Sequence, residues 1–68
     1  MSISRITTIK SSSPISFDDA IKAGVARANK TLKHVVGAWI KNQEVLIDES
    51  GQISEYRVEM KITFILED

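Results

Sequence analysis

The final quarter of the chain has the clearest alternation of hydrophobic and polar positions. From Tyr56 to Leu66 every second residue is apolar, and the positions between are mostly charged or polar. A period of two is typical of a strand with one face in the core. Residues 35–47 are also strand-like, and Asp48–Gly51 between the two segments is a turn signal. The pattern therefore predicts a long hairpin at the end of the chain.

A helix is predicted over residues 17–33, where apolar positions recur at helical spacing. Ser16 is a suitable N-cap, because its hydroxyl can accept a hydrogen bond from a free backbone N–H three residues on. Before the helix, residues 2–10 are rich in isoleucine and threonine, which favours a strand that the run Ser11–Pro14 is expected to end. The expected core-facing stripe of the helix is Phe17, Ile21, Val25, Ala28 and Leu32.

These elements predict one α+β domain over residues 1–68, with the order β-α-β-β and a three-stranded antiparallel sheet on one helix. A turn centred near Ser50 would place Lys41 opposite Glu59 and Gln43 opposite Arg57, which are favourable cross-strand pairs. The residues expected to face the helix are then Val36, Ala38, Ile40, Met60, Ile62 and Phe64.

The same register places Trp39 on the face away from the helix, whereas a slip of one residue would bury Trp39 and expose Ile40. One helix cannot cover both faces of such a sheet. The uncovered face is expected to carry Val35, Gly37, Trp39 and Ile65. Large apolar groups on an open face indicate contact with another chain or a ligand. Self-association is therefore expected on physical grounds alone.

Composition excludes several kinds of site. The 68 residues include no cysteine and one histidine, which excludes disulfides, thiolate metal sites and a site with several histidines in one chain. Nine basic and nine acidic residues balance, whereas a nucleic-acid-binding protein normally carries a basic surface. No run approaches the length of a membrane span, and the first ten residues lack the features of a secretion signal. We expect a cytoplasmic protein with no membrane or nucleic-acid partner.

Several segments together resemble the dodecin family of small β-α-β-β proteins that form hollow shells of twelve subunits. The first matching segments are the Ser-rich end of the N-terminal strand and Ser16–Ile21. Ala26–Ala28 and Lys30–Val35 follow, and the closing strand matches from Glu55 to Glu67. The resemblance implies a dodecin-like fold and a non-enzymatic homododecamer that stores a small ligand.

Flavin, as riboflavin, FMN or FAD, is the ligand that the resemblance implies, held between symmetry-related tryptophans and by a glutamine. This chain has Gly37 at the position of that tryptophan and Arg57 at the position of the glutamine. Its single tryptophan, Trp39, lies two residues further on. The candidate ligand-binding residues are Gly37, Trp39, Gln43 and Arg57. The alternative is an assembly that binds a metal ion such as calcium, as described for a branch of the family, or another small molecule.

Each candidate also has a purely structural interpretation. Trp39 is either a stacking platform or a residue of a subunit interface. Arg57 either binds an anionic group or pairs with a neighbouring side chain. The oxygen-rich turn Asp48–Gly51 offers too few ligands for calcium in one copy. His34 is expected near the helix end, and no catalytic serine–histidine or paired-carboxylate arrangement is evident in the sequence.

Overall fold

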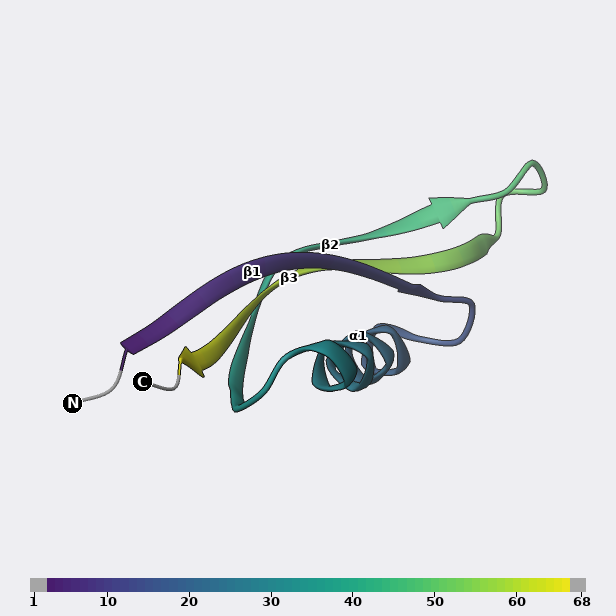
Figure 1. The fold of residues 1–68 in the computed structure, drawn as a ribbon. Helices are drawn as coiled ribbons and strands as arrows, with labels where there is room; N and C mark the ends of the chain where they lie inside the picture. Colours follow the sequence, from purple (N-terminus) through teal and green to yellow (C-terminus); the bar gives the residue numbers. More distant parts are fainter. Residues whose placement is uncertain (1–2, 67–68) are drawn as a thin grey trace.

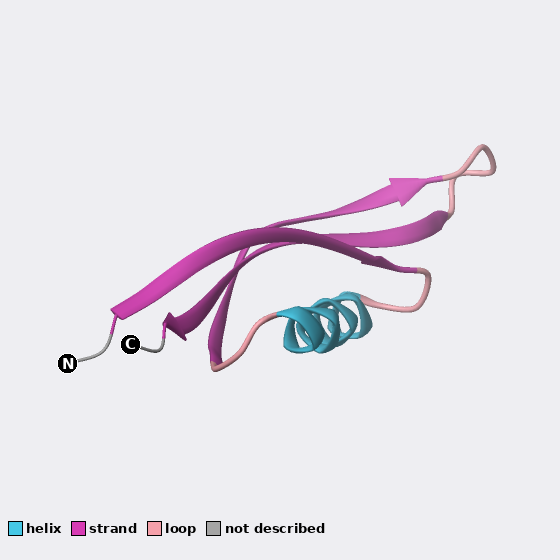
Figure 2. Ribbon diagram, in the orientation of Figure 1, coloured by secondary structure: helices cyan, strands magenta, loops and turns pink. Residues whose placement is uncertain are grey.

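The structure is a computed structural model that describes residues 3–66. A single helix lies under one face of a three-stranded antiparallel sheet, in which β3 is the central strand and the order is β1-β3-β2 (Figures 1 and 2). The predicted β-α-β-β fold is confirmed. The elements are β1 (Ile3–Ser13), α1 (Phe17–Thr31), β2 (Val35–Ile47) and β3 (Ile53–Leu66). The helix α1 is not long and apolar enough to cross a membrane.

Strand β1 extends past the point where the sequence pattern ends it. The serine run was expected to break the strand, but Ser11, Ser12 and Ser13 continue the pairing with β3. Ser13 is 2% exposed, and its hydroxyl donates to the carboxylate of Asp19 at 2.6 Å and accepts from the N–H of Ile15 at 2.9 Å. These two bonds tie the end of β1 to the first turn of α1, which compensates for burying a hydroxyl.

Helix α1 begins as predicted and ends two residues early. The hydroxyl of Ser16 accepts from the N–H of Asp19 at 3.0 Å, which confirms the N-cap. The helix ends at Thr31 rather than at residue 33. Its fully buried positions are Ala20, Gly24 and Ala28, so small residues form the centre of the contact with the sheet. The predicted stripe is confirmed at buried Ala28 and at Phe17, Ile21 and Leu32, which pack partly buried against the core. Ala20 and Gly24, which the stripe did not include, complete the buried centre.

The core lies between α1 and the helix-facing side of the sheet. Its largest fully buried side chains are Val58, Met60 and Ile62, all from β3. A Cβ added to Gly24 would meet the Cε atom of Met60 and would lie 3.1 Å from the Cβ atom of Ser11, so a side chain there requires the end of Met60 to move. Partly buried Ile40 packs on this cluster, and the register in which Trp39 lies opposite Lys61 is confirmed.

Three register shifts between β2 and β3 overturn parts of the predicted pairing. Between Val35 and Gly37 the register shifts, and Val35, not Val36, packs on the core. Val36 is 64% exposed, so its predicted place under the helix is wrong. The predicted place of Val35 on the uncovered face is wrong for the same reason. Because a bulge adds one residue to one strand, side chains after it change faces.

Between the other two shifts, at Ile40/Asn42 and at Leu46/Ile47, the register differs by one residue from the predicted one, which replaces both of the predicted cross-strand pairs. Asn42 instead of Lys41 lies opposite Glu59. Beyond it, Glu44 lies opposite Arg57, and Gln43 lies opposite Val58. The polar partners on the uncovered face of β2 are therefore each one residue later than the sequence pattern indicates.

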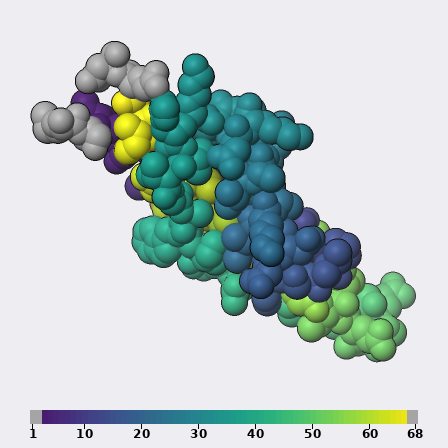
Figure 3. Space-filling view, turned by 90° about the horizontal axis from the view of Figure 1, so that it is seen from below, coloured from purple at the N-terminus to yellow at the C-terminus, as the bar shows by residue number. Residues whose placement is uncertain are grey.

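Within residues 3–66, no element covers the face of the sheet away from α1. Seen from the helix side, the tip of the β2–β3 hairpin also projects beyond α1 (Figure 3). The radius of gyration is 14.1 Å, against about 11 Å for a compact domain of this length. The exposed surface is 5090 Å², against about 4,300 Å² for a typical monomer of this mass. A subunit with this excess surface is suited to association.

Candidate functional site

The uncovered face is ordered in rows of side chains that run across the three strands. Residues directly opposite one another in antiparallel strands share a face, and the buried residues of β3 assign the other face to α1. Four successive rows are Ile6–Thr63–Gly37, Thr8–Lys61–Trp39, Lys10–Glu59–Asn42 and Ser12–Arg57–Glu44. The face thus changes along the strands from apolar and aromatic to charged.

Gly37 and Trp39 lie at the apolar end of this face, as predicted. Trp39 is 64% exposed, and Ile6 on β1 is exposed as well. A Cβ added to Gly37 would meet no atom within 4 Å, so the space above this glycine is open. The indole therefore stands beside open backbone, where a flat molecule has room to stack on it.

A groove of about 590 Å³ occupies the charged end of the face. Its lining includes Arg57 and Gln43, two of the predicted ligand-binding residues, but neither Gly37 nor Trp39. Lys10 and Ser12 of β1 with Asn42 and Glu44 of β2 form its two sides. The structure thus separates Gly37 and Trp39 from Arg57 along the uncovered face, and Gln43, although part of the groove lining, lies opposite buried Val58.

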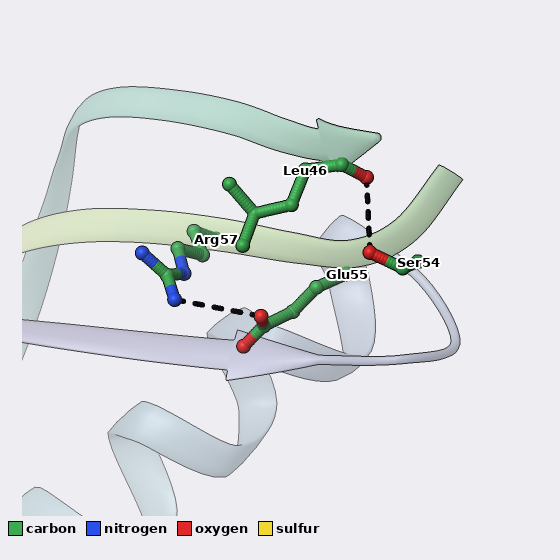
Figure 4. Close-up of polar contacts among 4 residues, drawn as sticks. All are labelled: Leu46, Ser54, Glu55 and Arg57. Atoms are coloured by element: carbon green, nitrogen blue, oxygen red, sulfur yellow. Dashed lines mark hydrogen bonds and ion pairs between the residues drawn. The ribbon is translucent and has the colours of Figure 1, made fainter. Parts of the chain in front are cut away.

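The pairing predicted between Arg57 and Gln43 does not form. Gln43 lies opposite buried Val58, in the register of the helix-facing side, whereas Arg57 is on the uncovered face. The guanidinium of Arg57 contacts the carboxylate of Glu55 at 3.5 Å, and the hydroxyl of Ser54 donates to the carbonyl of Leu46 at 3.3 Å (Figure 4). An exposed ion pair of this kind contributes little to stability, so Arg57 can exchange its partner at low cost.

Glu59 is the acidic centre of the charged region. The Nδ2 group of Asn42 donates to its carboxylate at 2.8 Å. This hydrogen bond is the main reason why the pKa of Glu59 lies below its ordinary value, and desolvation opposes it. The positive charges of Lys41, Lys10 and Lys61 lower the same pKa further. The positive charges of three lysines therefore act on one carboxylate, which also accepts the hydrogen bond from Asn42.

Sequence reasoning did not identify Lys10, Ser12 or Asn42 as residues of the site. Lys10 and Ser12 come from β1, and the pairing of β1 with β3 has no turn in the sequence that fixes its register. Asn42 enters the site only because of the shift in β2. The signal that was available is the period-two pattern of β3, which places Arg57, Glu59 and Lys61 on one face.

The described residues do not form a metal site within one chain. In residues 3–66 there is no group of three or more histidine, cysteine or acidic side chains that is arranged to hold a metal ion. The carboxylate of Asp48 instead accepts from the N–H and hydroxyl of Ser50 and from the N–H of Gln52. These bonds close the hairpin turn. A calcium site would need oxygens from several copies of the chain.

Comparison with known proteins gives a consistent result along the chain. Residues 3–67 match the family model of dodecins, whereas no curated protein matches. A crystal structure of a dodecin point variant from Thermus thermophilus superposes with a TM-score of 0.92 at 31% identity, over 100% of both chains. Dodecin from Streptomyces coelicolor has a TM-score of 0.92 at 28% identity, over 98% of this chain and 94% of that one.

A calcium-chelating relative also has this fold. The calcium dodecin of Mycobacterium tuberculosis, an immunodominant antigen with a novel calcium-binding site, has a TM-score of 0.82 at 25% identity. The match covers 96% of this chain and 91% of that one. With the family model matching nearly the whole length, and with the same β-α-β-β architecture, the chain belongs to the dodecin family.

Proposed function

We propose that this chain assembles as a homododecamer that binds and sequesters a flavin on the uncovered face of its sheet, without catalysing a reaction. The observation that carries the proposal is the exposed Trp39 beside the open space at Gly37, in a chain of the dodecin family. An aromatic ring stacked there and covered by another subunit is shielded from solvent. Stacking and exclusion of water quench and protect the ring, and no residue has to perform chemistry.

Assembly is supported by the surface that one subunit leaves exposed. Apolar side chains concentrate at both ends of the sheet, where the helix gives no cover. They are Ile3, Ile6, Val36, Trp39 and Leu66 at one end and Ile47 and Ile53 at the other. Burying such groups against other copies stabilises an assembly by about 25 cal/mol per Å² of apolar surface. This supports a fold that is completed by its neighbours.

Two measurements on the purified protein test the proposal. Size-exclusion chromatography with light scattering is expected to give about twelve times the chain mass of 7.6 kDa. Riboflavin or FMN added at micromolar concentration is expected to lose its fluorescence on binding. A stable monomer contradicts the assembly, and full flavin fluorescence in the presence of intact assembly contradicts the flavin site.

Calcium is the second candidate ligand, because the M. tuberculosis relative of the same fold is a calcium dodecin. Residues 3–66 of one chain hold no ready group of three acidic or histidine ligands, so this alternative requires carboxylates from several copies. Equilibrium dialysis against calcium, with and without a chelator, tests it. Calcium retained by the assembly together with unquenched flavin favours this alternative over the flavin site.

A further inference from the structure

The tip of the β2–β3 hairpin, residues 47–53, combines exposed apolar side chains with negative charge. Ile47 lies directly opposite Ile53, so their side chains share a face, and both are exposed. The tip carries two acidic residues, Asp48 and Glu49, and no basic one. It projects beyond α1, so the helix gives it no cover (Figures 1 and 3).

The turn within the hairpin tip has a fixed shape. The N–H of Asp48 donates to the carbonyl of Gln52 at 2.8 Å, and the N–H of Gly51 donates to the carbonyl of Asp48 at 3.0 Å. The carboxylate of Asp48 is occupied by the bonds that close the turn. Exposed Glu49 forms no hydrogen bond or ion pair among the described residues. Its carboxylate is therefore free for a partner, and a turn that is already ordered loses little entropy on docking.

A second groove, of about 380 Å³, has the complementary character. It lies between α1 and β1, which is an edge strand of the sheet. Partly buried Ile9 and Leu32 contribute to its apolar wall. Its charged residues are Lys10 and Arg27, and no acidic residue is part of its lining. This α1–β1 groove therefore offers an apolar surface beside positive charge.

The hairpin tip of the same chain cannot fill the α1–β1 groove. Ser11 is the lining residue of β1 that lies nearest to the hairpin tip, and it is paired with Val58. Ile53 is five residues away from Val58 along β3, which corresponds to about 16 Å. A second copy of the chain can bring its tip to the groove. Such a contact joins two different surfaces, and repetition of it closes into a ring when the rotation between copies allows.

We propose that, in the assembly, the hairpin tip of one copy docks in the α1–β1 groove of another. The two isoleucines of the tip pack on the apolar wall of the groove, and Glu49 pairs with Arg27. Arg27 is exposed and forms no ion pair among the described residues, and its guanidinium can bind a carboxylate through two hydrogen bonds. Lys10 is the less specific cation, because its charge also acts on Glu59. This inference rests on the proposed assembly and names one contact that builds it.

Charge reversal in the full chain tests the pair. Glu49→Arg and Arg27→Glu each place like charges in the contact, so each is expected to raise the concentration at which the assembly dissociates by at least about tenfold. Light scattering over a dilution series measures that concentration. The double variant Glu49→Arg/Arg27→Glu restores opposite charges and is expected to return it to within about threefold of the unmodified protein. The control Lys22→Glu makes the same charge change on α1 outside the groove and is expected neither to weaken the assembly nor to rescue Glu49→Arg.

Cross-linking provides a second measurement that does not depend on a loss of assembly. The chain has no cysteine, so Glu49→Cys/Arg27→Cys introduces the only two thiols of each copy. A short bismaleimide is expected to join neighbouring copies into a ladder of covalent oligomers. In the matched control Glu49→Cys/Lys22→Cys, far less of the protein is expected to enter the ladder.

The outcomes separate this contact from the assembly as a whole. An assembly that neither charge reversal weakens, or a double variant that is not restored, overturns the pairing of Glu49 with Arg27. Equal cross-linking in the two cysteine variants, or none in either, overturns the docking of the tip in the groove. In each of these cases the proposed assembly stands. An unmodified chain that remains monomeric refutes the assembly itself, and the contact with it.

Discussion

Replacing Trp39 with alanine separates ligand binding from subunit folding. The indole is 64% exposed in the subunit, so its removal is expected to change the fold by much less than the 3–5 kcal/mol of a buried tryptophan. A ring stacked on an aromatic side chain gains about 1–3 kcal/mol. Loss of that stacking is expected to weaken flavin binding by about 5- to 150-fold. Because the indole is exposed in the subunit, its removal is expected to affect the bound ring more than the fold.

The assay for Trp39→Ala combines three measurements on one sample. Flavin titration gives the affinity, urea unfolding the stability, and light scattering the mass of the assembly. An intact assembly with weakened flavin binding identifies the indole as a platform. If Trp39 anchors a subunit interface instead, the assembly is expected to weaken by 2 kcal/mol or more, as interface anchors do. Ile15→Ala, which removes a 70% exposed side chain from the loop before α1, is the control and is expected to leave flavin affinity unchanged. Unchanged affinity and unchanged mass in Trp39→Ala would refute both roles.

Three further predictions concern the fold that positions the site. In Gly24→Ala the added methyl group meets the end of the Met60 side chain, which has to move inside the core because Met60 is fully buried. Overpacking of about 1–3 kcal/mol is therefore expected to outweigh the roughly 1 kcal/mol gain in helix propensity, and urea unfolding that shows Gly24→Ala to be more stable contradicts this. Ser13→Ala removes the buried hydroxyl that joins β1 to α1 and is expected to lower the free energy of unfolding by about 1–3 kcal/mol. An unchanged midpoint of urea unfolding contradicts this prediction. The hydrogen bond from the Ser50 hydroxyl is the main reason why the pKa of Asp48 lies below its ordinary 3.8. The ionised carboxylate therefore stabilises the folded protein above pH 3.8, and this stabilisation is lost as the pH falls through the lower pKa of Asp48 in the folded state. Asp48→Asn is therefore expected to be less stable than the unmodified protein at pH 7, with a difference that shrinks in acid; a difference that is constant with pH contradicts it.

The sequence predicts the fold because its strongest signal lies in the element that organises the sheet. Strand β3 is central and alternates from Tyr56 to Phe64, so one face of it enters the core at Val58, Met60 and Ile62. The N-cap at Ser16 and the hairpin turn carry local chemistry that is independent of tertiary contacts. These signals are sufficient for the element order, the helix start and the face of Trp39.

The details that could not be predicted depend on contacts between elements. Val35 and Val36 are chemically identical neighbours, so no hydrophobic pattern indicates which of them enters the core after the bulge. The buried centre of α1 consists of alanine and glycine, whose small size matters only because β3 lies so close to them. Lys10 joins the site through pairing of β1 with β3, strands that are far apart in the sequence.

The change from apolar to charged side chains along the uncovered face resolves a conflict between its two proposed roles. A face that completes the core by association has to be dry, whereas burying an ionised lysine or glutamate without a partner costs several kcal/mol. Ile6 and Trp39 lie at one end and meet the first condition, while Lys10 and Glu59 lie in the next rows and require water or a charged ligand. The shift between Ile40 and Asn42 falls at this boundary, and it places Asn42 rather than another lysine beside Glu59. Subunit contact and ligand binding can therefore use adjoining rows of one sheet, with Trp39 at the border between them.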